Sequence, residues 1–74
     1  AAQAEAEKIV AVAPNDLDAN YYLGVILAAN DSDADRKRAV IHLNRFLQHA
    51  PANDPGRPDV IAVLDVLKQM GVTQ

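Results

Sequence analysis

The stretch that decides the fold lies between two prolines. Residues 14–51 read PNDLDANYYLGVILAANDSDADRKRAVIHLNRFLQHAP. Two runs with apolar residues every three or four positions, the spacing of helices, flank a short polar and acidic segment. Asn and Asp follow Pro14 directly and recur within three residues of Pro51. The stretch therefore predicts two helices joined by a loop, with a chain break at each proline.

Helical spacing continues on both sides of this stretch. Apolar residues recur at three- and four-residue intervals before Pro14, and Val60, Val63, Leu64 and Leu67 form a second stripe near the end of the chain. We predict an all-α fold of four helices without strands, at Ala1–Ala13, Leu17–Ala29, Asp35–His49 and Pro58–Met70.

The predicted helix ends carry residues suited to them. Asn15 and Asp16 offer side-chain oxygens to cap the second helix, and the aspartates before the third can cap it or stabilise its positive N-terminus. Pro58 suits a first turn, where its missing N–H is not needed, and Gly71 is a natural stop. Gly24, inside the second helix, costs about 0.5–1 kcal/mol relative to Ala, which predicts that another backbone comes close there.

Composition limits the classes of function. The 74 residues suffice for one small domain, half of them are hydrophobic, and only three are aromatic. We therefore expect closely packed helices with small core side chains. The net charge of −3 argues against nucleic acid, since phosphate binding needs clustered Lys and Arg. No apolar stretch approaches the roughly 20 residues of a membrane span. No cysteine is present, so we expect neither a disulfide framework nor a thiolate metal site.

The chain contains a weak internal repeat. The motif APND at residues 13–16 returns as APAND at residues 50–54, and the two prolines lie 37 residues apart, from 14 to 51. Leu23 and Gly24 form a Leu-Gly pair in the first helix of this interval, Ala39 is a small residue in the second, and Pro51 closes it. This pattern resembles the tetratricopeptide repeat, a two-helix unit with a period of about 34 residues.

The resemblance implies a domain organisation. Residues 17–50 would be one complete repeat, residues 1–13 the second helix of a preceding repeat, and residues 58–70 a capping helix or the first helix of the next. All 74 residues would form one domain, built of antiparallel helix pairs in a right-handed superhelix. The chain departs from the family at four positions. Asn20, Leu27 and Leu43 stand where the family has aromatic residues, and Phe46 stands where it has a small residue.

The family's first helices line a concave groove that holds a peptide. In this chain the resemblance points a set of seven residues into that groove: Asp18, Tyr21, Val25, Ala28, Ile61, Asp65 and Lys68. Tyr21 would supply a flat apolar surface with one polar tip. A carboxylate clamp of Lys, Arg and Asn, found in relatives that bind chaperone C-termini, is not expected here. The other interpretation is that Tyr21 and Tyr22 pack between helices with their hydroxyls at the surface.

Two groups of residues have side chains of the types that bind metal ions. Asp31, Asp33 and Asp35 alternate as in a calcium loop, but an EF-hand would need Gly where Arg36 stands and Glu where His42 stands. We interpret them as a solvated loop. His42 and His49 lie seven residues apart on one helix without supporting ligands, which predicts surface or boundary residues. No catalytic set emerges, so we expect no metal, no cofactor and no enzymatic activity.

Two functions remain open on this basis. The first is a protein-interaction module that binds a peptide or a partner segment on its concave face. The second is structural, in which the first helix, lacking a cover, stacks on another copy or on an upstream solenoid. The chain has no initiator Met and starts within a predicted helix, so we expect it to be the C-terminal fragment of a longer protein. Bacterial cytoplasm and periplasm are equally compatible with its composition.

Overall fold

The computed structural model describes residues 2–72 and confirms the all-helical prediction. This part of the chain forms four helices and no strands: α1 (Ala2–Val12), α2 (Leu17–Ala29), α3 (Asp33–His49) and α4 (Gly56–Gln69). The bounds of α2 are those predicted, and α1 ends one residue early. Ala1, the predicted first residue of α1, lies outside the described residues.

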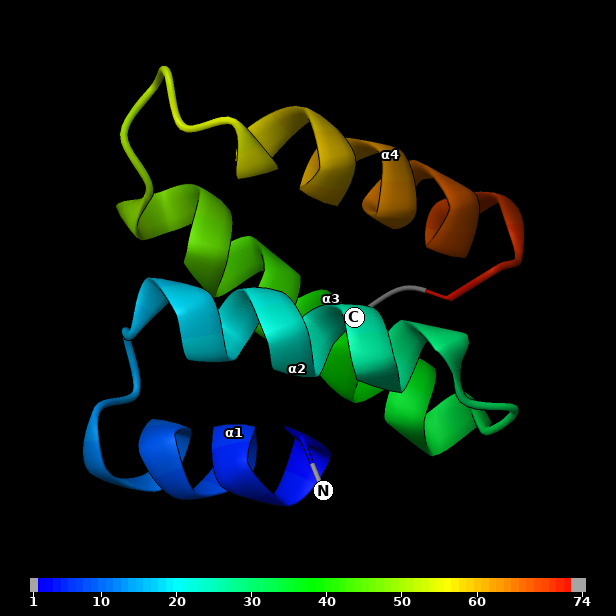
Figure 1. Cartoon of the computed structure of the whole chain (residues 1–74). Helices are drawn as coiled ribbons and strands as arrows, with labels where there is room; N and C mark the ends of the chain where they lie inside the picture. Colours follow the sequence, from blue (N-terminus) through cyan, green and yellow to red (C-terminus); the bar gives the residue numbers. More distant parts are fainter. Residues whose placement is uncertain (1, 73–74) are drawn as a thin grey trace.

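The helices alternate in direction along the chain. In Figure 1, α1 and α3 run from right to left, whereas α2 and α4 run from left to right. The central element is α2, which packs against α1, α3 and α4, while α3 also contacts α4. An ion pair between Arg38 and Glu7 joins α3 to α1. The two helices α2 and α4 therefore lie side by side and run in the same direction. The helix that connects them, α3, runs in the opposite direction.

Side-chain caps mark where α2 and α3 begin. Asp16 caps α2, its carboxylate accepting the N–H of Ala19 at 2.9 Å as predicted. The cap of α3 is Ser32, whose Oγ accepts the N–H of Asp35. In the last connection, Asp54 Oδ1 accepts the N–H of Gly56 at 2.8 Å. Both α3 and α4 begin two residues earlier than predicted, and Asp33 and Asp35 lie in the first turn of α3.

Gly71 ends α4 as predicted, in a left-handed conformation with φ of 84°. The N–H of Gly71 donates to the carbonyl oxygen of Lys68, and the N–H of Val72 donates to that of Leu67 at 2.9 Å. These two bonds define a Schellman motif, which satisfies carbonyl groups that the helix leaves open. Val72 packs against the core next to this turn, so the end of the helix is closed by an apolar contact as well.

The core lies on α2 and α3 and is completed by α4. The side chains of Leu23, Leu27, Leu43, Ala39 and Val60 are at most 1 % exposed. Gly24 is buried where α2 crosses α3, and a Cβ atom there would lie 2.6 Å from Leu43 Cγ and 3.4 Å from Leu43 N. The prediction of a close approach at Gly24 is thus confirmed. The bulk at this crossing is supplied by Leu43 on the other helix.

A polar pair interrupts this core. Asn20 is 1 % exposed and His42 is 8 % exposed, and Asn20 Oδ1 lies 2.9 Å from His42 Nδ1. The prediction that His42 is a surface or boundary residue is therefore wrong. A polar partner on the facing helix lets the ring be buried, and the spacing of residues along one helix does not reveal such a partner.

Candidate functional site

The acidic run Asp31, Asp33 and Asp35, at the start of α3, is paired within the chain. Arg36 makes ion pairs of 3.0 Å with both Asp31 and Asp33, and Asn30 donates to Asp35 at 3.1 Å. Among residues 2–72, no three His, Asp or Glu side chains gather as candidate ligands for a metal ion. Pairing with Arg36 accounts for Asp31 and Asp33, and Asp33 and Asp35 belong to the first turn of α3. Only Asp31 therefore lies in a loop as predicted.

The predicted groove residues fall into two sets. Asp18 and Tyr21 lie in the first two turns of α2 and line a pocket between α2, α3 and the start of α4. The others lie farther along α2 and on α4 and line neither of the two pockets described below. Among them Ala28 packs partly against the core, and the rest are exposed: Val25, Ile61, Asp65 and Lys68.

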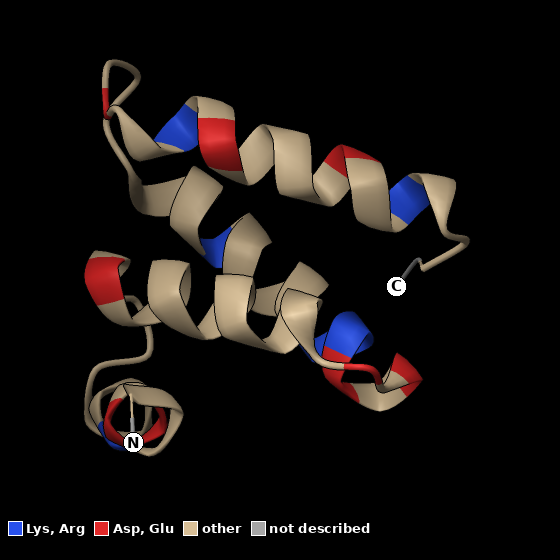
Figure 2. Cartoon of the chain, turned by 45° about the vertical axis from the view of Figure 1, so that its right-hand side comes forward, with Lys and Arg blue, Asp and Glu red and all other residues tan. Residues whose placement is uncertain are grey.

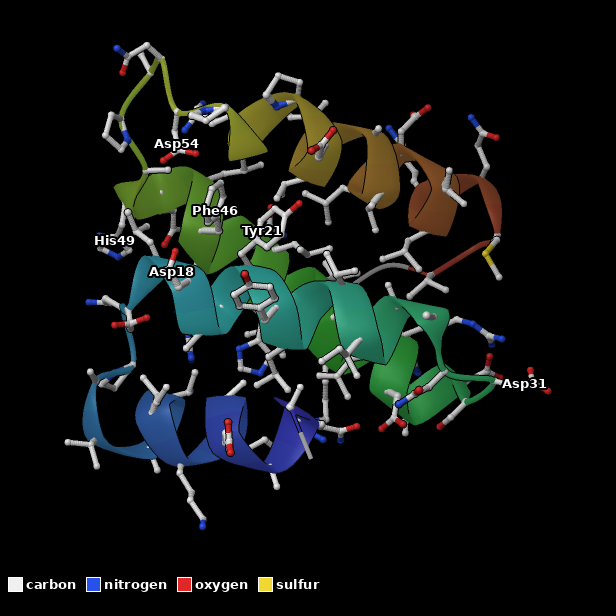
Figure 3. The ribbon with its side chains drawn as sticks, viewed as in Figure 1. Asp18, Tyr21, Asp31, Phe46, His49 and Asp54 are labelled. Carbon is white, nitrogen blue, oxygen red and sulfur yellow. The ribbon has the colours of Figure 1, made fainter. Side chains whose placement is uncertain are left out.

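The first pocket, here called the aromatic pocket, has a volume of about 220 Å³. Its lining comprises Leu17, Asp18, Tyr21, Tyr22, Phe46, Asp54 and Gly56. The Tyr21 ring stands at 88° to that of Tyr22 with centroids 5.8 Å apart, and at 58° to that of Phe46 with centroids 5.5 Å apart. All three aromatic rings of the chain therefore meet here as inclined walls. Figure 3 shows Asp18, Tyr21, Phe46 and Asp54 gathered at one end of the molecule, opposite Asp31.

A second pocket lies on the other side of α2 and is here called the α1–α2 pocket. It has a volume of about 300 Å³ and is lined by Ala2, Glu5, Ala6, Ile9, Asp18, Ala19 and Tyr22. Asp18 and Tyr22 line both pockets. The two hollows are therefore neighbours, separated by one exposed ridge on α2.

Tyr22 is the residue that the sequence interpretation undervalued. It was expected to pack between helices, yet its side chain is 60 % exposed and forms the ridge between the two pockets. Its position along the helix could have predicted this exposure. The buried stripe of α2 is Asn20, Leu23, Gly24 and Leu27, and the residues opposite that stripe at helical spacing are Asp18, Tyr22, Val25 and Ala29. All four of these are exposed.

Glu7 and His42, which line neither pocket, have pKa values shifted by their surroundings. Burial is the main cause that lowers the pKa of His42 below 6.5, with repulsion from Arg45 and Arg38 adding to it and attraction by Glu7 opposing it. The hydrogen bond from Arg38 holds the pKa of Glu7 below 4.5. The ion pair between α1 and α3 therefore stays charged at neutral pH, whereas burial favours the neutral form of the His42 ring.

The helices between residues 2 and 72 include none long and apolar enough to cross a membrane. Comparison of the chain with protein-family profiles, with characterised proteins and with solved structures finds no match. Function must therefore be argued from the face that carries the two pockets.

Proposed function

We propose that this chain is a non-enzymatic protein-interaction module of tetratricopeptide-like helices, which binds an extended segment of a partner protein across α2. The observation that carries the proposal is the pair of neighbouring pockets that share Asp18 and Tyr22. Two side chains of one extended segment could enter these pockets while its backbone crosses the ridge. Tyr is a residue type enriched among those that dominate binding energy at interfaces.

The size of the pockets favours a peptide over a small molecule. Cavities that enclose drug-sized ligands measure about 300–1,000 Å³. The aromatic pocket, at about 220 Å³, is smaller, and the α1–α2 pocket, at about 300 Å³, lies at the lower limit. Each has room for roughly one side chain. An extended peptide presents its side chains one after another, so two of them can occupy two neighbouring pockets on the helix surface.

The packing supports the repeat interpretation. In a stack of two-helix units, the first helices of successive units lie side by side and share a direction, and α2 and α4 are arranged in this way (Figure 1). Gly24 and Ala39, which match the family's small positions, are both buried between helices. We propose that the helices continue as a right-handed superhelix in which residues 17–50 form one unit.

A display library of random peptides tests the proposal. Peptides selected on the wild-type chain should lose most of their affinity for a Tyr22→Ala variant, because an exposed ring at the centre of the face is removed. Ile41→Ala is the matched control: Ile41 is also an exposed apolar residue, 38 % accessible, but lies on α3, behind α2 in Figure 1. Selected peptides that bind Tyr22→Ala and wild type equally would place the binding surface elsewhere.

A second candidate function is self-assembly through α1. Ala6 is the only buried residue of α1, and Val12 is 87 % exposed. A second copy could cover the outer side of this helix and bury apolar surface there. Light scattering from roughly micromolar to millimolar concentration tests this. Assembly predicts a dimer that Val12→Glu dissociates, whereas a monomer at every concentration would leave the interaction module as the proposed function.

A further inference from the structure

We propose that the aromatic pocket binds the cationic side chain of a Lys or Arg, so that the partner segment is basic. This inference rests on the proposed function, because it names the chemistry of one side chain of the bound segment. It draws on three independent features of the pocket: its rings, its carboxylates and its size.

The rings supply an attraction that is selective for cations. A Lys ammonium or Arg guanidinium over an aromatic ring is held by the negative face of its π-system, within about 6 Å of the ring centroid. Tyr21, Tyr22 and Phe46 all line the pocket, and neighbouring rings are inclined by 88° and 58°. Because all three residues line one pocket, a cation held there is next to a cluster of aromatic side chains.

Two carboxylates complete the lining. The side chain of Asp18 forms no hydrogen bond or ion pair with any residue between 2 and 72. Asp54 uses Oδ1 to accept the N–H of Gly56, and no described side chain donates to its Oδ2. Figure 2 shows acidic positions in red at the start of α2 and in the loop before α4, at the same end of the molecule. The pocket thus offers negative charge that the chain does not neutralise itself.

Positive groups at this end of the molecule are weaker or already engaged. The N-termini of α2 and α4 each carry about half a positive charge, which would favour an anion. Asp16 at the cap of α2 and Asp59 in the first turn of α4 oppose these charges, in addition to Asp18 and Asp54. Arg57 Nη1 donates to the carbonyl oxygens of Leu47 and Ala50, at 2.8 and 3.2 Å. Asp16 and Asp59 therefore offset the two helix N-termini, and the charged residues that line the pocket itself are Asp18 and Asp54, both acidic.

The pocket's size depends on Gly56. A Cβ atom at this position would lie 2.9 Å from Phe46 Cζ and 3.3 Å from Tyr21 Cε2. Any larger residue would therefore push against two of the three rings. With Gly56 in place, the pocket has a volume of about 220 Å³, which leaves room for a butylammonium- or propylguanidinium-sized group.

The test is a titration of the ¹⁵N-labelled chain followed by NMR at constant ionic strength. The probes are n-butylammonium and n-propylguanidinium, with n-butanol and inorganic phosphate as controls of matched size or opposite charge. We expect saturable shifts of the amides of Asp18, Tyr22 and Gly56 with both cations at roughly 1–100 mM. Butanol and phosphate should produce no saturable shifts there. Equal shifts with butanol, or saturable shifts with phosphate alone, would overturn the proposal.

Matched variants locate the cation. Asp18→Asn keeps the size of the side chain, and we expect it to weaken cation binding about two- to fivefold, the range of a partly exposed charge pair. Asp31→Asn removes the same charge at the opposite end of α2 (Figure 3) and should leave binding unchanged. Gly56→Ala should abolish binding by moving the rings. Equal weakening by Asp18→Asn and Asp31→Asn would show general charge attraction and contradict a specific site.

The two proposals fail in different ways. If peptides selected on the chain are neutral or acidic yet lose affinity for Tyr22→Ala, the interaction module stands and the cation site is wrong. If butylammonium binds the aromatic pocket but no displayed peptide is retained, the cation site stands and the proposed peptide-binding function is wrong.

Discussion

Asn20 and His42 form a hydrogen-bonded pair between α2 and α3, inside an otherwise apolar core. Asn20 Nδ2 donates to the carbonyl oxygens of Pro14 and Asp16, both at 2.8 Å, which leaves Oδ1 to face His42 Nδ1 at 2.9 Å. Since Oδ1 can only accept, Nδ1 must carry a proton and donate. The neutral ring is therefore the Nδ1–H tautomer, and Asn20 joins the turn before α2 to α3.

Replacing Asn20 tests the importance of this pair. In Asn20→Ala, the Nδ1–H of His42 loses its acceptor and the carbonyl of Pro14 loses its donor. The buried ring N–H left without a partner costs about 1–3 kcal/mol, and the lost bond to the exposed Pro14 adds about 1 kcal/mol, so we expect the free energy of unfolding to fall by about 2–4 kcal/mol. Urea unfolding followed by circular dichroism measures this. Asn44→Ala, on a half-buried residue of α3, is the control and should cost less than about 1 kcal/mol.

His42 should make stability depend on pH. Its pKa in the folded chain is lowered from 6.5, chiefly by burial, so the unfolded chain takes up a proton at a higher pH than the folded one. Stability from this group is complete above pH 6.5 and is lost as the pH falls from there toward the folded pKa. We therefore expect a lower urea midpoint at about pH 5.5 than at about pH 7.5.

Two variants separate His42 from other titrating groups. His42→Gln still offers a donor to Asn20 but does not titrate, and should largely remove the difference between the two pH values. His49→Gln, at an exposed position in the last turn of α3, should retain it. A pH dependence that survives in His42→Gln would assign the effect to another group.

A methyl group at Gly24 should destabilise the crossing of α2 and α3. Ala is the better helix former by about 0.5–1 kcal/mol, which alone would stabilise the helix. The added Cβ, however, would lie 2.6 Å from Leu43 Cγ, and overpacking of a core costs about 1–3 kcal/mol. We expect Gly24→Ala to lower the free energy of unfolding by about 1–2 kcal/mol. Leu43→Ala in the same chain should relieve the clash, so the two effects would not add.

The two tyrosines should differ in their effect on stability. Tyr21 packs against the core beside Phe46, so Tyr21→Ala should cost about 2–3 kcal/mol. Tyr22 is 60 % exposed, and Tyr22→Ala should change the free energy of unfolding by less than about 1 kcal/mol. Thermal unfolding of the two variants side by side measures the contrast. A large loss for Tyr22→Ala would mean that this ring serves the fold and would remove it as a clean probe of binding.

Local signals predicted most of the secondary structure. The apolar spacing and the cap at Asp16 located α2, and Gly71 marked the end of α4. These signals are reliable because each depends on residues within one or two turns of the helix. The starts of α3 and α4 were each placed two residues late. The cap of α3 is Ser32 and the residue before α4 is Pro55, whereas the prediction relied on charge in the first turn and on Pro58.

The candidate site was less predictable. Asp18 and Tyr21 were expected in the groove and do line the aromatic pocket, but Tyr22 was expected between helices and is the exposed ridge. Asp54 and Gly56 entered no prediction of a site. They reach the pocket only because the connection before α4 brings the chain back to the start of α2. The two segments lie more than 30 residues apart in the sequence, so no local pattern indicates that they meet.

The amino-acid sequence by itself determined that the described chain is helical, where its helices break, and that a small residue was needed at Gly24. These properties follow from backbone preferences and from the period of apolar residues, which act over a few positions. The tertiary structure alone decided that His42 is buried and that three rings and two carboxylates share one pocket. Each of these depends on contacts between different helices, and the angle and distance at which two helices cross are set by the packing of all their side chains together.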